Sequence, residues 1–438
     1  MDLHLLGQLN HAALLLSLAL LWAIGIPWAW TVVQHLRFRR AGLAREARLL
    51  ETALPPDRDL PHVLVQIPTY NEGHLIHDVV AAVANFDWPR DRLHIQVLDD
   101  STGESLDAAR DAVAAVGRQG IDAVLLHRDG RAGFKAGALA EGLAQSQHGY
   151  VAIFDADYQP PRNFLRACMR PLLRDPRLAF VQARCDFRNA RENWMTCAQQ
   201  RILDAHFAVE QATRSWTGQI LPFNGTCGIW RRLAIEDAGG WQADTLAEDL
   251  DLSYRVQMEG WHALFLVSVT APGELQSTLE SWRAQQSRWV KGPAEAARKL
   301  VPRLWRSRLR FGQKLLSTLT LAGSLLGPVI GIVALSLVLD LALGAGLTPA
   351  SEVLLALAAS QAILAQAGMI LLGQRLARGS GGTAELLELP LVLSLLIYRA
   401  LANLRGVGEA IADRSSSFVR TPKSGNPGRP VTGTLDDR

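Results

Sequence analysis

Cysteine is scarce in this sequence. Among 438 residues there are four cysteines, Cys168, Cys185, Cys197 and Cys227, and no two of them form a Cys-x-x-Cys pair. Disulfide frameworks and structural zinc sites depend on such short spacings, so neither is expected here. The four thiols are predicted to be small buried side chains in a protein of a reducing compartment.

Two common nucleotide-binding motifs are also missing. The chain contains neither a Walker loop nor a Gly-x-Gly-x-x-Gly fingerprint, so ATPase and dehydrogenase activities lack their usual phosphate-binding anchors. No basic stripe interleaves with aromatic residues across the middle of the chain, and nucleic acid is therefore not an expected partner. Internal repeats are absent as well.

Hydrophobic residues make up 49% of the chain and are concentrated in two regions, 12–36 and 315–404. The first region is not typical of a cleaved signal peptide, because no lysine or arginine precedes it. Ala12 to Val33 has the length of a membrane-spanning helix. The basic residues Arg37, Arg39 and Arg40 follow it. By the positive-inside rule, the N-terminus is expected outside and the chain enters the cytoplasm near Arg37.

The C-terminal region contains two good spanning candidates, at about 315–339 and 353–373. A third apolar run, 386–404, is interrupted by Glu388, Pro390 and Arg399, so it either spans the membrane or lies at its interface. Four spans would put the C-terminus outside, whereas the basic residues after this run favour a cytoplasmic tail. We therefore favour an internal tail, with 386–404 not a simple span.

The middle of the chain alternates between two patterns. Short runs rich in valine, isoleucine and leucine, typical of strands buried on both faces of a parallel sheet, alternate with amphipathic helical patterns. This alternation predicts an α/β layer fold. The predicted strands are 62–67, 93–98, 123–126, 150–154, 179–183 and 263–267, and helices are predicted over 75–86, 106–116 and 279–300, the last broken near Gly292-Pro293.

Charged residues follow three predicted strands. The first strand leads into Pro68-Thr69-Tyr70-Asn71-Glu72, the second ends in Asp99-Asp100, and the fourth ends in Asp155-Ala156-Asp157. One aspartate at a strand end is more often a turn or helix cap than a ligand. Carboxylates from three strands at one sheet edge, however, repel each other unless a cation is present. The Asp-x-Asp pair suits Mg²⁺ or Mn²⁺, which bridge to phosphates, and this predicts a nucleotide diphosphate ligand.

Two more segments carry candidate site residues. Lys135 lies among glycines and alanines between Arg131 and Gly137, where a phosphate contact and a plain solvated loop are equally consistent with the sequence. Glu248-Asp249 precedes a helical run, either as charge compensation at a helix N-terminus or as a general base.

Tryptophans mark the approach to the C-terminal apolar region. Trp282 and Trp289 are candidates for membrane-interface anchors or for sugar-stacking platforms, and the neighbouring Gln285 and Arg288 make a purely lipid-facing role less favoured. The histidines His74, His77, His206 and His262 show no metal-ligand spacing and are interpreted as ordinary surface or partly buried residues.

Seven segments occur together in a fixed order. They are Gln66 to Glu72, Val97 to Thr102, Gly133 to Leu139, Phe154 to Asp157, Phe223 to Thr226, Glu248 to Leu252 and Gln285-x-x-Arg288-Trp289. As a set they resemble glycosyltransferase family 2, in its membrane-embedded, processive branch, over about residues 60–425. The residue sequences of these motifs are most similar to those of plant cellulose-synthase-like mannan and glucan synthases and their bacterial relatives. Phe418 to Lys423 loosely resembles the cytosolic gating loop of cellulose synthases.

The resemblance implies a Rossmann-like catalytic domain of the glycosyltransferase A type, with Asp249 as the base. One departure is visible, since the family's usual Thr-Glu-Asp is Ala247-Glu248-Asp249 here. The site residues that the resemblance implies are Thr69, Tyr70, Glu72, Asp99, Lys135 and Asp155 for the nucleotide-sugar donor, Asp157 with Asp155 for the metal, and Glu248, Gln285, Arg288 and Trp289 for the acceptor and diphosphate platform.

These observations predict five segments. They are an N-terminal transmembrane helix (1–40), a cytoplasmic glycosyltransferase domain (55–275), amphipathic interface helices (276–314), a C-terminal transmembrane region (315–410) and a partly disordered cytoplasmic tail (411–438).

The predicted function is that of an inverting β-glycosyltransferase of the bacterial inner membrane. It would use Mg²⁺ or Mn²⁺ and transfer a hexose from UDP-glucose or GDP-mannose to a growing polysaccharide. The expected partners are the donor, a polysaccharide or lipid acceptor, membrane lipids and accessory export subunits. Two alternatives stay open at this point, a non-processive enzyme that makes a membrane glycolipid and a catalytically silent membrane scaffold.

Overall fold

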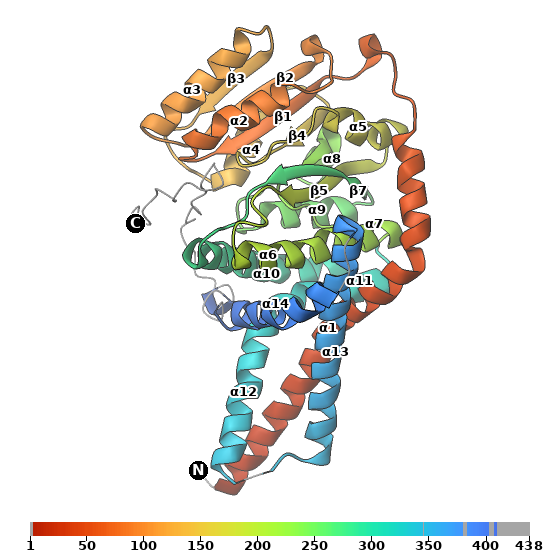
Figure 1. Cartoon of the computed structure of the whole chain (residues 1–438), viewed down its shortest axis with the longest axis vertical. Helices are drawn as coiled ribbons and strands as arrows, with labels where there is room; N and C mark the ends of the chain where they lie inside the picture. Colours follow the sequence, from red (N-terminus) through yellow and green to blue (C-terminus); the bar gives the residue numbers. More distant parts are fainter. Residues whose placement is uncertain (1–2, 345, 380–382, 403–406, 410–438) are drawn as a thin grey trace.

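The computed structural model of the chain describes residues 3–344, 346–379, 383–402 and 407–409. Figure 1 shows three levels along its long axis: a sheet domain, a layer of helices that lie across the axis, and long helices that extend to the far end. The predicted tail 411–438, with the segment that resembles a gating loop, lies outside the described residues.

The sheet domain is built on seven strands in the order β3-β2-β1-β4-β6-β5-β7. Every residue of β1 is buried, as expected for a strand covered on both faces. All neighbouring pairs are parallel except the two that involve β6. The strands are β1 Val63–Thr69, β2 Leu93–Asp99, β3 Asp122–His127, β4 Tyr150–Ile153, β5 Leu178–Phe187, β6 Gly228–Arg231 and β7 His262–Gly273.

The predicted α/β fold and all six predicted strands are confirmed, but β6 was missed. Its four residues, Gly228–Arg231, are too few for a periodic pattern, and antiparallel pairing on both sides holds them in the sheet. Gly228 is required there, because a Cβ at this position would lie 2.4 Å from the Phe223 ring. A short antiparallel strand thus continues a sheet that the sequence predicts to be parallel throughout.

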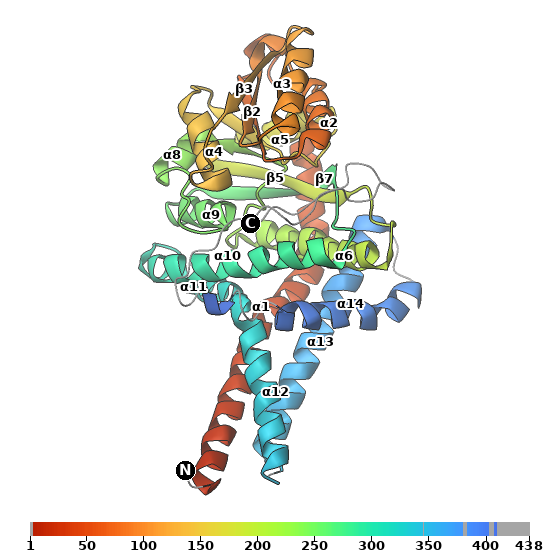
Figure 2. The same ribbon diagram turned by 90° about the vertical axis from the view of Figure 1, so that its left-hand side faces the viewer.

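Helices cover both faces of the sheet. Figure 2 shows α2 and α3 on one face and α4, α8 and α9 on the other. The first pair was predicted within two residues, and its buried side chains recur at helical spacing. These helices are α2 Gly73–Ala84, α3 Glu104–Gly117, α4 Phe134–Ala144, α8 Arg232–Asp237 and α9 Glu248–Met258, and α5 Phe164–Arg174 completes the domain.

The middle layer contains α6 (Trp194–Asp204), α10 (Leu279–Arg306) and α14 (Thr383–Ala402), which lie across the long axis in both views. The predicted break in α10 is wrong, because the helix continues through Gly292 and Pro293. Gly292 serves packing instead: a Cβ there would lie 2.9 Å from the Cβ of Ala247. The small residues Gly292 and Ala247 let α10 approach the start of α9, which carries Glu248 and Asp249.

Three helical segments are long and apolar enough to cross a membrane, within the part of the chain that the structure describes. They are His4–Leu50 (in α1, Leu3–Leu50), Phe311–Ala342 (α11 Phe311–Leu321, a 3-10 turn and α12 Leu326–Ala342) and Pro349–Arg378 (α13). Each contains one of the spanning segments predicted from sequence. Helix α14 is not among them.

The first helix is tied to the catalytic sheet. It extends to Leu50, and near its end Glu46 accepts hydrogen bonds from the backbone N–H groups of Val267 (3.0 Å) and Ser268 (2.7 Å). These two groups lie in β7 at the irregularity in its pairing with β5, where the ladder leaves donors unpaired. The contact fixes the sheet relative to the long helices.

Candidate active site

The loops that follow β1 and β2 are joined at the carboxyl edge of the sheet. The Asn71 N–H donates to Ser101 Oγ (2.8 Å), and the Thr102 N–H donates to Asn71 Oδ1 (3.1 Å). Asn71 adopts a positive φ of 52°, which asparagine tolerates better than most residues. The predicted donor-binding residue Thr69 is buried at the end of β1, level with Asp99 on β2.

Both aspartates at the end of β2 are paired with residues at the end of β3. Asp99 is fully buried, and its Oδ2 accepts from His127 Nδ1 (2.9 Å) and from the Ser101 N–H (3.2 Å). Arg128 binds both oxygens of Asp100, at 2.7 and 2.6 Å. Asp99 Oδ1 is a buried acceptor with no hydrogen-bond partner among the described residues. The pair is therefore rigidly placed, with one carboxylate oxygen left to accept from a ligand.

Tyr70 forms a flat cationic surface with a residue from the glycine-rich segment. The Arg131 guanidinium lies over its ring, 3.4 Å from the centroid. Such stacking is favourable between an arginine and an aromatic face. The loops after β1 and β3 are thereby held together beside Asp99 and Asp100.

Lys135 lies at the centre of the acidic residues. Its Nζ donates to Asp155 Oδ1 (2.5 Å) and to the Gly225 carbonyl (3.0 Å). Burial alone lowers the pKa of this ammonium, but the charges of Asp155 and Glu248 outweigh it and the net pKa is raised. Lys135 is thus a permanent positive charge among carboxylates, and the phosphate-contact alternative gains support over the solvated loop.

Gly225 allows the carboxylates and the lysine to approach each other. Its φ is +76°, and a Cβ there would lie 3.0 Å from Asp249 Oδ2 and 3.3 Å from Lys135 Nζ. The following residue, Thr226, accepts the Asp155 N–H at 3.0 Å. The segment Phe223 to Thr226, just before β6, therefore forms one wall of the site, in contact with Lys135 and Asp155.

Glu248 and Asp249 form the first turn of α9. Both are half-buried, and both pKa values are raised. Loss of hydration, with the neighbouring charge of Glu248 next, raises the pKa of Asp249 to about 7, against the opposing effect of Lys135. A carboxylate with a pKa near neutrality is suited to accept a proton at physiological pH.

Asp157 lies deeper than Asp155. It is buried, and its Oδ2 accepts from the Glu274 N–H at the end of β7 (3.3 Å). Arg188 donates to the Asp157 carbonyl and pairs with Glu274, both at 3.2 Å. The two predicted metal ligands therefore occupy one turn, Asp155 facing Lys135 and Asp157 facing the β7 end.

Helix α10 brings the Gln-x-x-Arg-Trp segment to the same site. Arg288 is half-buried, and burial lowers the pKa of its guanidinium against the charges of Glu72, Asp155 and Glu248. Trp289 is 49% exposed, so a flat apolar face is available beside the site. Gln285 is half-buried on the same helix.

Trp282, by contrast, is not available as a platform. It is 3% exposed and stacks with Tyr398 of α14, with ring centroids 6.2 Å apart. Of the two tryptophans, only Trp289 is free to meet a sugar.

The carboxylates fit a hard divalent cation. Asp155, Asp157, Glu248 and Asp249 offer only oxygen donors, the set that Mg²⁺ and Mn²⁺ prefer. Burial is the main cause that raises the pKa of Glu248 and of Asp249, and the charge of Lys135 opposes it. A cation bound by Asp155 and Asp157 would add positive charge beside them.

Sequence reasoning missed the residues that hold the site in shape. His127 and Arg128 position Asp99 and Asp100, and Arg188 positions the turn at Asp157. His127 and Arg128 directly follow the strand predicted over 123–126, and that position is a usable signal. Arg188 has no such signal, because the strand predicted over 179–183 ends five residues before it, and only the structure extends β5 to Phe187.

Comparison with known proteins identifies similar sequences and a similar fold. Residues 61–292 match the model of "Glycosyltransferase like family 2". A glucomannan 4-beta-mannosyltransferase from Arabidopsis thaliana is 45% identical over 245 residues, which is 55% of this chain and 46% of that protein. One from Cyamopsis tetragonoloba is 41% identical over 274 residues, covering 62% of this chain and 51% of that protein. The chain spans about half the length of these relatives.

Among solved structures, a mannosyltransferase from Pyrobaculum calidifontis in complex with GDP-Man and Mn²⁺ has a similar fold. Its TM-score is 0.55 at 21% sequence identity, covering 90% of this chain and all of that one. The family match covers more than half of the chain, from β1 to the middle of α10, and includes every predicted site residue. The chain belongs to glycosyltransferase family 2, as its ordered motifs predict.

Proposed function

We propose that this protein transfers mannose from GDP-Man to the growing end of a β-1,4-linked mannan or glucomannan, with inversion at the anomeric carbon. The observation that carries the proposal is the meeting of Asp249, Lys135, Asp155 and Arg288 at one sheet edge. The names of the relatives favour mannose over glucose, and a GDP-Man complex of a similarly folded protein is consistent with this choice.

In the proposed reaction, Asp249 accepts the proton of an acceptor sugar hydroxyl. The oxygen then attacks the anomeric carbon as the bond to the nucleotide diphosphate breaks. Lys135 and Arg288 stabilise the negative charge that develops on the leaving diphosphate, since fixed cations in a partly buried site act strongly on such charge. A divalent cation held by Asp155 and Asp157 would supply further charge stabilisation when bound.

Other residues would bind the two substrates. Asp99 offers a buried oxygen to the nucleotide, and the Tyr70–Arg131 stack gives a flat cationic wall beside it. Thr69 and Glu72 flank this wall. Trp289, with Gln285 on the same helix, offers a stacking face for the acceptor sugar.

We also propose that the catalytic domain faces the cytoplasm of a bacterial cell. Three spans with an outside N-terminus return the chain to the catalytic side after α13, where α14 lies against α10. The basic residues Arg37 to Arg40 in α1 lie toward this same side.

The test is transfer from radiolabelled donors by the purified full-length chain in lipid nanodiscs with Mn²⁺. We expect incorporation from GDP-Man at least tenfold above that from UDP-glucose, and a product cut by a β-1,4-mannanase. A polymer cut only by a glucanase would assign the other donor. A product the size of a lipid with one sugar would favour the glycolipid alternative. Absence of both transfer and donor hydrolysis would favour the silent scaffold.

A further inference from the structure

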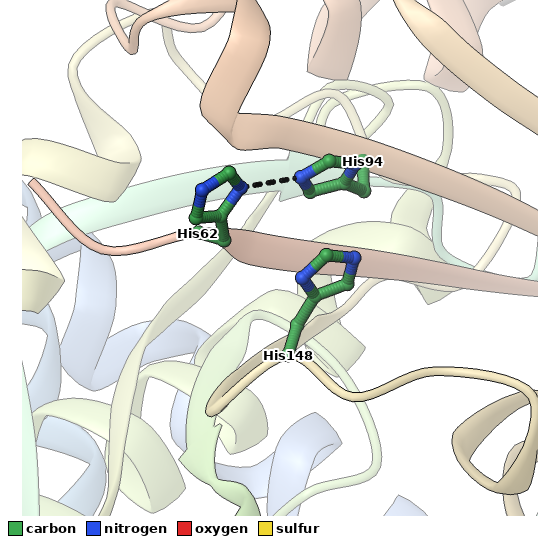
Figure 3. Close-up of side chains that lie close together, drawn as sticks. All are labelled: His62, His94 and His148. Atoms are coloured by element: carbon green, nitrogen blue, oxygen red, sulfur yellow. Dashed lines mark hydrogen bonds between the residues drawn. The ribbon is translucent and has the colours of Figure 1, made fainter.

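Three histidines gather at the amino edge of the sheet, opposite the candidate active site. His62 precedes β1, His94 is the second residue of β2, and His148 lies two residues before β4. Figure 3 shows the three imidazoles side by side. They are 32 and 54 residues apart in the sequence, and the parallel strands β2, β1 and β4, which are neighbours in the sheet, bring their starts together.

Their ring nitrogens are close enough to share one ion. One nitrogen from each of the three rings lies within 4.8 Å of the others. His62 Nδ1 and His94 Nε2 are 2.8 Å apart, and the rings of His94 and His148 stack with centroids 3.9 Å apart. Among the described residues, these three form the one group of histidine, cysteine and acidic side chains with this ligand geometry.

A carboxylate from the next strand fixes the tautomer of the central histidine. His94 Nδ1 lies 2.6 Å from Asp122 Oδ2 on β3. The imidazole N–H donates to the carboxylate, so His94 Nε2 carries a lone pair that faces His62. The same carboxylate–histidine arrangement orients the ligands of zinc sites and raises their basicity.

The charged side chains that face the third histidine, His148, are Asp122 and Arg232. Arg232 is engaged with Glu236 and the Ser146 carbonyl. A neutral imidazole is the form that binds a metal.

We propose that His62, His94 and His148 bind a divalent transition metal ion of the zinc class, with Asp122 as the carboxylate that orients His94. The ion replaces the proton that His62 Nδ1 shares with His94 Nε2, and that proton moves to the exposed Nε2 of His62. Tetrahedral coordination at about 2.0–2.1 Å requires nitrogens about 3.3 Å apart, so the 2.8 Å contact opens by about half an ångström. His148 rotates about its side-chain torsions to direct a nitrogen at the ion, and water completes the site.

An ion bound there would cross-link the starts of β2, β1 and β4. Asp122 would extend this link to the start of β3. The donors are nitrogens, which suit zinc, nickel and copper, whereas the active site offers oxygens that suit Mg²⁺ or Mn²⁺. The two sites therefore select different ions. The proposal does not depend on the donor sugar or on the reaction at the opposite edge.

The test uses Co²⁺ as a spectroscopic probe of the full-length chain in detergent, followed by displacement with Zn²⁺. We expect the intense visible absorption of four-coordinate Co²⁺, at one ion per chain, because carboxylate sites hold Co²⁺ in weakly absorbing octahedral form. His62→Gln and His148→Gln are expected to lose this absorption. Asp122→Asn is expected to weaken Co²⁺ binding by about 10- to 100-fold.

His262→Gln is the matched control, since His262 is the exposed first residue of β7 at the same sheet edge. It should bind Co²⁺ as the parent chain does. Far-ultraviolet circular dichroism checks that each variant is folded, and the exposure of His62 makes His62→Gln the variant least prone to misfold. Absence of four-coordinate absorption in the parent chain, or its persistence in both folded histidine variants, would overturn the proposal.

Discussion

The two edges of the central sheet differ in chemistry although the same three strands build both. The three histidines lie at or just before the starts of β1, β2 and β4, and these strands end near Tyr70, Asp99 and Asp155. The amino edge collects imidazoles, and the carboxyl edge collects carboxylates with Lys135 and Arg288. A parallel sheet gathers like ends of its strands, so residues far apart in sequence form a cluster at each edge.

Both edges bring side chains from distant parts of the sequence close together, so a cluster of side chains alone does not identify the proposed catalytic edge. At the carboxyl edge, the loops after β1, β2 and β3 bond to each other, and a cation lies among acidic groups whose pKa values are raised. At the amino edge, the observed contact is between imidazole rings, and the rings of His94 and His148 stack on each other. Seven-residue strands separate the two edges by about 20 Å, so variants should affect one edge without the other.

The largest expected effect is that of Asp249→Asn. Removal of the proposed base should lower the turnover of the proposed mannosyl transfer by about 10³-fold, within the range that general bases contribute, while the donor Kd changes by no more than about threefold. Radiolabelled transfer and calorimetric titration of GDP-Man measure the two quantities. Glu259→Gln, an exposed carboxylate beyond the other end of α9, is the control. Near-normal turnover in Asp249→Asn would disprove the assignment of the base.

Gly225→Ala tests the close approach at the carboxyl edge. Its Cβ would press against Asp249 and Lys135, so transfer should fall by about 10²-fold, as small displacements of reacting groups do. Gly218→Ala is a matched control, since Gly218 has a similar φ of +65° and no atom within 4 Å of its Cβ position. Both variants should lose about 1–2 kcal/mol of stability from the left-handed backbone. Equal transfer rates in the two variants would contradict the crowding argument.

The pKa of Asp249 predicts opposite pH trends for activity and stability. In the absence of donor and cation its pKa is about 7, well above the 3.8 of an exposed aspartate. With the cation bound, the pKa of Asp249 is expected below this value, and kcat/KM should fall about tenfold per pH unit once the pH drops under it. Between pH 4 and 7 the native state binds more protons than the unfolded state, so the stability that this group contributes is lost as pH rises.

Thermal melts of the parent chain and Asp249→Asn, recorded in EDTA, test the stability trend. Because the amide cannot ionise, the variant should gain Tm relative to the parent chain as pH rises from 5 to 8, by a few degrees. A difference in Tm that does not change with pH would show that Asp249 is already ionised at pH 5.

The smallest expected effect is that of His148→Gln on sugar transfer. Its side chain lies at the amino edge, so turnover with GDP-Man should stay within about twofold of the parent chain at saturating Mn²⁺. The same variant should lose four-coordinate Co²⁺. A tenfold loss of turnover in folded His148→Gln would show that the two edges are coupled.

Sequence reasoning predicted the parts that depend on local pattern. The buried strand runs and the helices between them follow from periodicity, and the structure confirms them. The three predicted spanning segments each lie in a helix that is long and apolar enough to cross a membrane. Thr69, Tyr70, Asp99 and Asp155 could be assigned to one edge, because strand ends in a parallel sheet share an edge. The ordered motifs also identified the family, which the comparison confirms.

Other features had no local signal. β6 is held by its two neighbours rather than by its own four residues. Helix α10 continues through Gly292 and Pro293, and the glycine there allows close packing against Ala247. Trp282 and Trp289 are alike in the sequence, and only the position of α14 buries the first.

The sequence by itself determined the α/β pattern and the family, and it provided a set of charged candidate residues for the proposed sugar-transfer site. The tertiary structure decided which of these residues meet. It placed Asp249 beside Lys135 across Gly225, and it stacked three histidines whose spacing in the chain carries no motif. The physical reason is that periodicity records which face of an element is buried, whereas contacts between distant residues depend on strand order and on the close packing of whole elements.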